Sequence, residues 1–498
     1  MPRRQEPAPR YSLLRWLFSF PAFLATALMG LTVITVRERL NDPDLWWHLK
    51  LGEIIWRTRS IPRADFLSYT THGHAWIAHE WLAQLSIYGA WRLAGDTGLM
   101  LWLCVVASLL FVTLYVFCSL YSGNAKVSLL GGLIGWAFAT VGLAVRPLLL
   151  GHFFLVLELL LVHLARTRDR RWFWGLPWLF ALWANCHGSY MLGLLVLGLI
   201  AGCSFFDFSY GSVECQRWSA ALRRRFVAAA VLSAGALFLN PFGIRLVLYP
   251  FDLLLHQTNN IAFVSEWQPL NPHDSRAWAL YAVVGIVFLA ALSRRWRFRL
   301  EELALLALGL GMAVLHERML FAFGILAAPL ICRLCANAWE RYDPARDLRF
   351  MNALLMAGIC VGVAVAFPSR ANLQAQVAQS NPVQAMDYIR GRGLSGPMLN
   401  DYDFGGYLIW ALPDHKVFID GRADVYDWTG VFGEMARWAL LQEDPTRLLA
   451  KYGINFCLLH KTSPMAQVLP FLPGWKRVYS DRVAVVFARD KAGATDHR

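Results

Sequence analysis

Long apolar runs constrain this chain more than any other feature of its sequence. About eleven runs are long enough to cross ~30 Å of hydrocarbon as helices. They lie near residues 17–36, 99–121, 127–145, 148–165, 172–186, 189–207, 226–240, 276–293, 300–315, 319–337 and 350–367. Hydrophobic residues make up 57% of the chain and charged residues only 16%. The sequence therefore predicts an α-helical polytopic membrane protein. One long bent element around residues 144–151 would change the number of spans by one or two.

Arginine clusters between the runs set the predicted orientation. The net charge is +13, and the amino-terminal tail, "ARTRDRR", "QRWSAALRRR", "RRWRFR" and "ERYDPARDLR" all fall on one side of the alternating path. Lysine and arginine mark cytoplasmic loops. We therefore expect the amino terminus in the cytoplasm and everything after Pro368 outside. Because the basic clusters are explained as loops of a membrane protein, a nucleic-acid partner is excluded.

Polar clusters that are not simply basic fall almost entirely on the outer side. Each alone fits a solvated loop or a helix cap, but together they predict an outward-facing cavity, since polar groups at membrane depth mark functional sites. The clusters are Asn41–His48, Ala78–Trp81, Arg146, Asn185–Gly188, Asn240–Gly243, Ser265–Pro272 and His316–Arg318.

The first outer loop, residues 37–96, contains two amphipathic segments, 43–56 and 79–93. Both are expected to be helices lying in the membrane interface, with tryptophan rings at headgroup depth. The tryptophans concerned are Trp46, Trp47, Trp56, Trp76, Trp81 and Trp91.

Acids and histidines cluster in this loop. Asp42 before Pro43 fits a helix N-cap, and Asp44 fits the first turn, where the helix dipole favours negative charge. A cap at a cavity mouth also fixes a carboxylate in space. Asp44 and His48 are four residues apart and share a helix face. His79 and Glu80 add a second acid and imidazole. This set leaves a divalent metal ion open, although its spacing matches no specific metal motif.

The order of these parts resembles the GT-C superfamily of integral-membrane glycosyltransferases. The shared order is an inner amino terminus, one span, a long outer loop opening with acids, many further spans and an outer C-terminal domain. Such enzymes use polyprenyl-phosphate or polyprenyl-diphosphate sugars as donors. Their catalytic aspartate lies in the first outer loop, which corresponds here to Asp42 or Asp44. "DLWWH" is also similar to the acid-plus-histidine pattern of protein mannosyltransferases, with one extra residue of spacing.

A more specific resemblance is to a group of bacterial multi-pass proteins. The shared motifs are "DPDLWWHL", "HEWL", "HG" after "WAN", "NPFG", "EWQP" and "NDYDFGGYLIW…FIDGRADVY", which span nearly the whole chain. The resemblance implies the bacterial cytoplasmic membrane. It also implies transfer of a sugar to a glycolipid, polysaccharide or protein acceptor on the outer face of that membrane.

The chemistry of such a transfer assigns roles to further residues. A carboxylate base must deprotonate the acceptor, and Asp44, which faces His48, is preferred over Asp42. Charge on the leaving phosphate must be stabilised. The candidates for that role are Arg318 and Arg146, backed by His316 and His187; membrane snorkelling and buried structural sites are their alternatives. Glu266 is a candidate contact to the sugar or acceptor, or a loop cap.

The chain after residue 368 has the composition of a soluble domain, so we divide it into a transmembrane module, 1–368, and an outer α/β domain, 369–498. Expected strands are "GPMLN", "KVFID", "INFCLLH" and "VAVVFA", and expected helices include "NPVQAMDYIRGRG", "DPTRLLAKYG" and "SPMAQVLPFL". Acids and an arginine cluster at the strand ends, where open α/β sheets place ligands: Asp401, Asp403, Asp420, Arg422 and Asp424. Of these, Asp401, Asp403, Asp420 and Arg422 are the candidates for binding acceptor or sugar.

Two other classes of protein remain as alternatives. A lipid or glycan flippase would place ionisable residues near the middle of spans and would show an internal repeat, and neither feature is clear in the sequence. A non-catalytic membrane assembly protein fits if the acids serve only as caps.

Overall fold

The computed structural model describes residues 13–139, 142–293 and 295–490. A helix lies at each predicted apolar run. After the short α1 (Leu13–Leu17), these are α2 (Phe20–Val36), α5 (Asp96–Ser122), α6 (Ser128–Phe138), α7 (Pro147–Thr167), α8 (Gly175–Cys186), α9 (Tyr190–Cys203), α10 (Ala220–Ala236), α13 (Ser275–Leu292), α14 (Leu300–Leu315), α15 (Leu320–Leu334) and α16 (Arg349–Ala366). The helical membrane module is therefore confirmed.

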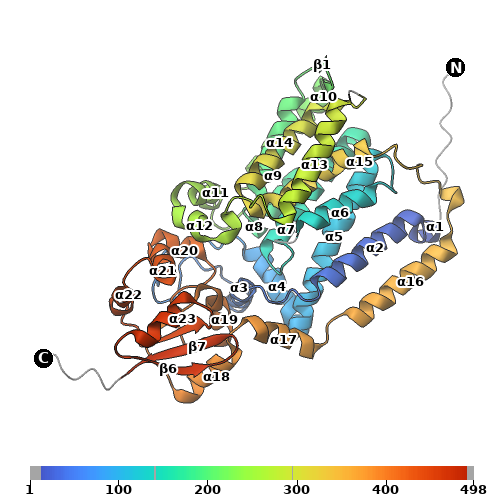
Figure 1. The fold of residues 1–498 in the computed structure, drawn as a ribbon. Coiled ribbons are helices and arrows are strands. Elements are labelled where there is room, and N and C mark those ends of the chain that lie inside the picture. Colours follow the sequence, from blue (N-terminus) through green and yellow to red (C-terminus); the bar gives the residue numbers. More distant parts are fainter. Residues whose placement is uncertain (1–12, 140–141, 294, 491–498) are drawn as a thin grey trace, which may run out of the picture.

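The number of spans stays a prediction. Among the described residues, four helices are both long and apolar enough to cross a bilayer: α5, α7, α13 and α16. α2, α6 and α9 are apolar but shorter. α2 and α16 run side by side at one edge of the bundle, although they lie at opposite ends of the module in sequence (Figure 1).

Basic residues of three predicted clusters, within 165–171, 216–225 and 295–299, lie at one end of the bundle, and most of the basic amino-terminal tail falls outside the described residues. At that end, β1 (Phe208–Tyr210) and β2 (Val213–Cys215) form an antiparallel pair, and β3 (Phe298–Arg299) joins β2 in parallel. Two buried glutamates at the start of α14 pair with arginines of other helices. Glu301 Oε1 lies 2.7 Å from Arg166 Nη1, and Glu302 Oε2 lies 2.5 Å from Arg333 Nη2. Short 3-10 helices complete this end: η2 (Arg170–Trp174) and η5 (Pro344–Arg346).

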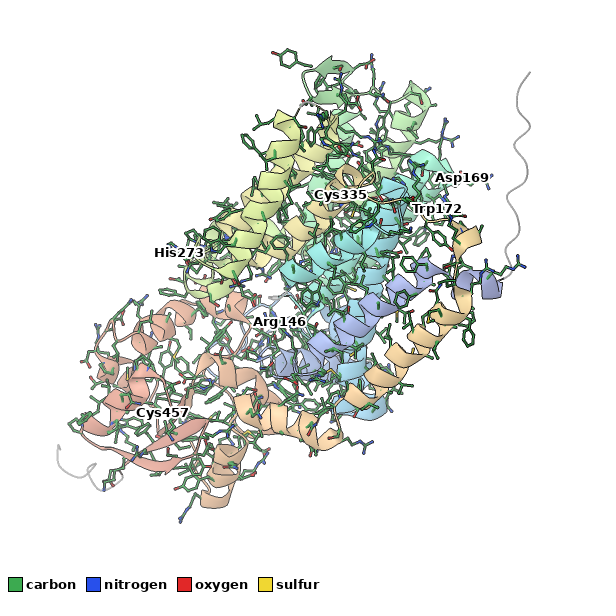
Figure 2. The ribbon with its side chains drawn as sticks, turned by 45° about the vertical axis from the view of Figure 1, so that its right-hand side comes forward. Arg146, Asp169, Trp172, His273, Cys335 and Cys457 are labelled. Carbon is green, nitrogen blue, oxygen red and sulfur yellow. The ribbon has the colours of Figure 1, made fainter. Side chains whose placement is uncertain are left out.

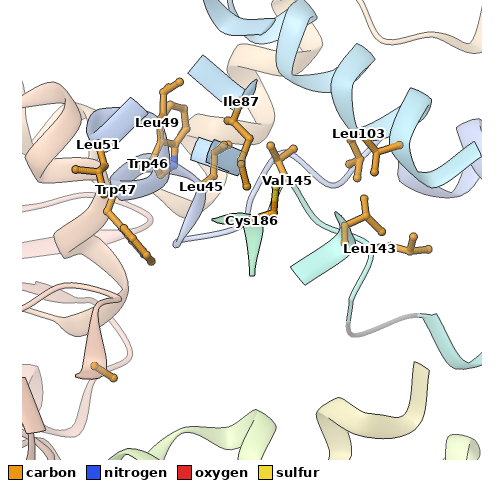
Figure 3. Close-up of a cluster of buried hydrophobic side chains, with 14 of the residues drawn as sticks. Leu45, Trp46, Trp47, Leu49, Leu51, Ile87, Leu103, Leu143, Val145 and Cys186 are labelled. Carbon is orange, nitrogen blue, oxygen red and sulfur yellow. The ribbon is translucent and has the colours of Figure 1, made fainter. Parts of the chain in front are cut away.

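Two helices of the first outer loop lie at the opposite end of the bundle. They are α3 (Leu45–Thr58) and α4 (Trp81–Ala94), within one or two residues of the predicted starts. The predicted headgroup depth was wrong for three of the six tryptophans of this loop. Trp46, Trp47 and Trp76 are buried inside the protein, and Trp46 meets Tyr407 of the C-terminal domain edge to face at 4.8 Å. Trp56, Trp81 and Trp91 are half-buried. Figure 3 shows Trp46 and Trp47 within this buried cluster.

A segment that the apolar runs did not reveal joins α10 to α13. It contains α11 (Ile244–His256), α12 (Thr258–Phe263) and η3 (Ser265–Trp267). α12 is held to the C-terminal domain because the Asn259 side chain and the Asn260 amide both donate to the Asp427 carboxylate, at 2.7 and 2.9 Å. The short η4 (Glu317–Met319) connects α14 to α15 beside this segment.

The C-terminal domain is built around a four-stranded mixed sheet. Its order is β4 (Met398–Asn400), β5 (Phe456–His460), β7 (Ala484–Arg489) and β6 (Trp475–Ser480); β4 and β5 are parallel and the other pairs antiparallel. The helices are α17 (Arg370–Ser380), α18 (Val383–Arg392), α19 (Tyr402–Ala411), α20 (Ala423–Trp428), α21 (Val431–Ala439), α22 (Pro445–Lys451), α23 (Pro464–Val468) and η6 (Leu469–Phe471). The predicted boundary at residue 368 falls between α16 and α17, and the predicted α/β class is confirmed.

One predicted strand of this domain was wrong. "KVFID" does not enter the sheet because its backbone bonds elsewhere: Val417 exchanges hydrogen bonds with Leu67 and Tyr69 of the first outer loop. The Phe418 amide instead donates to the side chain of Asn400, at 2.8 Å. The fourth strand is β6, which the sequence pattern did not reveal.

Candidate active site

A cavity of about 1230 Å³ lies where the bundle, the first outer loop and the C-terminal domain meet. The start of α3, the residues just before α4 and the ends of α7, α8, α9, α14 and α15 line it together with α11, α19 and the loop around Gly421. Figure 2 shows Arg146, one of its lining residues, between the C-terminal domain and the bundle, with Asp169 and Trp172 toward the far end. Six of the seven polar clusters predicted to share a cavity come together here. The prediction was wrong for Asn240–Gly243, which lines a separate, smaller cavity through Pro241 and Phe242.

Arg146, just before α7, pairs with three carboxylates from two segments, the turn before α3 and η3. Its Nε lies 2.7 Å from Asp42 Oδ2, its Nη2 3.3 Å from Asp44 Oδ2 and its Nη1 2.8 Å from Glu266 Oε1. Asp42 Oδ1 also accepts the Asp44 amide at 2.9 Å, which fixes the turn before α3. Arg146, Asp44 and Glu266 line the cavity, whereas Asp42 supports them.

Asp44 is the carboxylate best placed for proton transfer. Its Oδ1 accepts the Trp47 indole N–H at 3.2 Å, and its side chain keeps 22% of its exposure, facing the cavity. Burial raises the pKa of Asp44 to about 7; the charge of Arg146 opposes this rise, while Asp42 and Glu266 add to it. A base with a pKa near the working pH transfers protons most effectively.

Glycines of the C-terminal domain allow its close approach to Asp44. A Cβ at Gly421 would overlap Asp44 Oδ1, and a Cβ at Gly406 would lie 2.6 Å from the Pro43 carbonyl oxygen. Neither glycine has a positive φ, so contact rather than backbone conformation requires them. The segments "DFGGY", "IDGRADVY" and "NDPDLWWHL", which are distant in sequence, therefore pack against one another as one unit.

Glu80, just before α4, lies among three imidazoles. His48 Nδ1, His79 Nε2 and His187 Nε2 are 3.6, 3.6 and 3.5 Å from its oxygens. Burial raises the pKa of Glu80 to about 8, and burial lowers the pKa of both His48 and His79. Glu80 therefore carries a proton at neutral pH among uncharged imidazoles, and it can donate a hydrogen bond into the cavity.

Arg318, in η4, contrasts with Arg146. It has no carboxylate within 4.0 Å in the described part of the chain, and its guanidinium stacks on Trp267 at 4.2 Å from the ring centroid. Burial lowers the pKa of Arg318, but arginine keeps its charge at neutral pH. His316 Nδ1 donates to the Trp267 carbonyl at 2.7 Å, so its Nε2 is left for another partner. Both residues line the cavity.

The candidate residues of the C-terminal domain divide into two pairs. Asp401 and Asp403 line the cavity; Asp401 Oδ2 accepts the His460 amide at 2.5 Å, and burial raises the pKa of Asp401 to about 7. Asp420 and Arg422 are fully buried elsewhere and do not line it. Arg422 joins Asp420 and Asp65, each at 2.6 Å. We therefore assign this pair to docking the domain on the first outer loop.

Several cavity residues were missed as site candidates. Tyr402 and His460 come from the C-terminal domain, and His152 lies in α7. Tyr249 of α11 was also missed; its ring packs at a tilt against His79, with the ring centroids 4.4 Å apart. α11 carries no chemistry-bearing motif that would have indicated Tyr249. Asp424, which was predicted with the other acids of the C-terminal domain, lines the cavity beside it.

Among the described residues, no group of three or more His, Cys, Asp or Glu side chains has the geometry to hold a metal ion. We therefore derive no step through a metal.

Comparisons with known proteins connect this arrangement to solved structures. No protein-family profile matches the sequence, and no curated protein matches it. The oligosaccharyltransferase of Archaeoglobus fulgidus tethered with an acceptor peptide is similar in structure, with a TM-score of 0.55 at 13% identity, over 89% of this chain and 70% of that one. The same organism's AglB with an inhibitory peptide and a dolichol-phosphate gives 0.51 at 10% identity, over 89% and 70%.

A third similar structure is ArnT from Cupriavidus metallidurans bound to undecaprenyl phosphate, with a TM-score of 0.50 at 13% identity, over 93% of this chain and 97% of that one. AglB and ArnT are GT-C glycosyltransferases. At these identities the likeness concerns the fold, and it extends through the bundle, the first outer loop and the C-terminal domain. The protein therefore shares the fold of these solved structures.

Proposed function

We propose that the protein is a glycosyltransferase that moves a sugar from a polyprenyl-phosphate or polyprenyl-diphosphate donor to an acceptor on the outer face of the cytoplasmic membrane. The observation that carries this proposal is the composition of one cavity. It combines Asp44, a carboxylate of raised pKa, with an apolar slot and with Arg318, an arginine that has no carboxylate within 4.0 Å among the described residues. Binding of a lipid-linked phosphate requires the arginine and the apolar slot, and the transfer reaction requires the carboxylate.

The apolar slot suits an isoprenoid chain. Lining residues include Leu148, Leu155, Met191, Leu192, Leu195, Leu254, Phe263, Met312 and Leu315. Leu195, Leu254 and Leu315 are more than half exposed, so the slot opens at the bundle surface, where lipid tails would surround it. Dolichol-phosphate in AglB and undecaprenyl phosphate in ArnT are carriers of this class.

Arg318 is better suited than Arg146 to hold the donor phosphate. Arg146 is already neutralised by three carboxylates, and a phosphate brought to it would meet their negative charge. Arg318 offers its guanidinium N–H groups, and His316, directly before η4, offers its Nε2. The Trp267 ring holds the Arg318 guanidinium plane in position.

The transfer then follows from the positions of Asp44 and Arg318. Asp44 accepts the proton of the acceptor's hydroxyl or amide as that atom attacks the anomeric carbon. The bond between the anomeric carbon and the phosphate oxygen breaks, and the phosphate departs with the electron pair. Arg318 stabilises that charge. Attack from the face opposite the phosphate inverts the anomeric centre. Arg146 is a positioning residue that keeps Asp44 in place.

Purified protein in liposomes with radiolabelled undecaprenyl-phosphate sugars and envelope extract as acceptor tests this proposal. We expect Asp44→Asn to lower transfer by about 10²–10⁴-fold because the base is lost. Asp42→Asn should act through the position of Asp44 and cost less. Asp414→Asn is the matched control, since Asp414 is exposed in the C-terminal domain.

Full retained transfer in Asp44→Asn would reject the assignment of the base. Flipping of the labelled lipid between leaflets without sugar transfer would instead favour a flippase. No transfer from any donor of the panel, with no flipping, would favour a non-catalytic assembly protein.

A further inference from the structure

A second cavity, of about 500 Å³, lies beside the active-site cavity. Three segments that are distant in sequence surround it: the stretch between α3 and α4 in the first outer loop, the "NPFG" loop with α11, and α20 of the C-terminal domain. Its volume falls within the ~300–1,000 Å³ of sites for small ligands. None of the roles assigned above uses this space.

The two cavities share one wall. Tyr249 of α11 and Asp424 of α20 line both of them. Tyr249 packs at a tilt against His79, whose Nε2 faces Glu80 at 3.6 Å. Two side chains, Tyr249 and His79, would therefore separate a ligand in the second cavity from Glu80 of the active site.

The lining combines aromatic rings with charged groups of both signs. Trp76, Phe242, Tyr249 and Trp428 supply aromatic surface, and Arg63, Arg245, Asp252 and Asp424 supply charge. Trp428 is 56% exposed at the rim. Arg245 is also exposed, and it has no ion-pair or hydrogen-bond partner in the described ranges. Arg63 lies over the Phe242 ring at 5.5 Å and donates to the Pro241 carbonyl.

This chemistry fits a saccharide. A pyranose ring has an apolar C–H face, which packs on aromatic rings, and hydroxyl edges, which need charged or polar partners. An isoprenoid tail fits poorly because exposed arginines and acids surround the opening. The apolar slot belongs to the larger cavity alone, so donor lipid and second-cavity ligand would approach from different sides of the shared wall.

We infer that the second cavity binds the acceptor as an oligosaccharide, packed between Trp428 and Phe242 with Arg245 at its polar edge and its reacting hydroxyl directed to the Tyr249–Asp424 wall. The role of the bound saccharide as acceptor rests on the proposed function, whereas the binding of a saccharide in this cavity does not. It restricts the substrate to a glycan rather than a peptide.

Ligand-observed NMR on the full-length protein in nanodiscs tests the binding directly. The probes are cellotriose, trigalacturonate and, as the peptide comparison, trialanine. We expect saturation transfer to at least one saccharide and none to the peptide. Trp428→Ala should weaken saccharide binding by about fivefold and Arg245→Ala by about tenfold. Trp339→Ala and Arg482→Ala, both on exposed residues outside either cavity, are the matched controls.

Two results would overturn the inference: binding of trialanine but of neither saccharide, or saccharide binding that Trp428→Ala and Arg245→Ala leave unchanged. The measurement needs no donor, so its failure is separate from the failure of sugar transfer. Undecaprenyl-phosphate binding, measured on the same samples, should not change in either variant, and this confirms that they are folded.

Discussion

Charges at the two ends of the helical bundle are arranged in opposite ways. At the basic end Glu301 and Glu302 pair with Arg166 and Arg333, and the cavity beside them measures only about 50 Å³. At the other end three carboxylates share Arg146, while Arg318 has no carboxylate partner among the described residues, and the cavity is about 1230 Å³. Balanced pairs without open space stabilise a fold. Unbalanced charges around a cavity shift pKa values and leave groups available for a ligand.

Of the three changes described next, crowding of the Asp44 side chain should lower sugar transfer the most. A Cβ at Gly421 overlaps Asp44 Oδ1, so Gly421→Ala must displace the carboxylate or the loop. We expect transfer to fall by about 10²-fold, the scale for misplacing a reacting group by ~1 Å. Gly391→Ala in α18 is the control, because nothing lies within 4 Å of a Cβ there. Equal rates in both variants would contradict the close approach.

Acidity should have the next largest effect. Because the pKa of Asp44 is raised to about 7, Asp44 is protonated below that pH and cannot accept a proton. Transfer should therefore rise with pH through about 7 and fall by about tenfold per pH unit below it. Initial rates between pH 5.5 and 8 measure this. A flat profile over that interval would show that Asp44 does not limit the reaction as a base.

The smallest effect on transfer is expected at the basic end. Glu302→Gln removes one charge of a buried pair and leaves Arg333 with a neutral partner. The Tm should fall by several degrees while kcat/KM stays within about twofold. Thermal unfolding and transfer assays on one preparation compare the two quantities. A large loss of transfer in Glu302→Gln at unchanged Tm would contradict the view that the charge pairs of the basic end act only on stability.

Local and periodic features of the fold were predictable from the sequence. Hydropathy located the helices of the bundle, since backbone groups in lipid must bond within a helix. Charge alternation grouped Asp44, Glu80, Arg146, Glu266 and Arg318 before any coordinates placed them in one cavity. The positions of the helices and the grouping of the loops were predictable because the membrane constrains each segment separately, through its hydropathy and its flanking charges.

Long-range packing was not predictable in the same way. Arg422 was a candidate ligand contact because it follows a β-like segment, yet it pairs with Asp65, 357 residues away. Trp46 and Trp47 of α3 looked interfacial because their segment is amphipathic, but the C-terminal domain covers both. Glu158 in the middle of α7 was overlooked; it is fully buried and neither carboxylate oxygen has a hydrogen-bond partner in the described part. We have no physical account of Glu158.

Binding of undecaprenyl phosphate to the protein in nanodiscs tests the central claim most directly. The account predicts that Arg318→Gln weakens binding by about 10–100-fold, since a charge-assisted hydrogen bond in a buried site is lost. Arg482→Gln, on the exposed surface of the C-terminal domain, should bind as the wild type does. Unchanged affinity of Arg318→Gln for undecaprenyl phosphate would contradict the account.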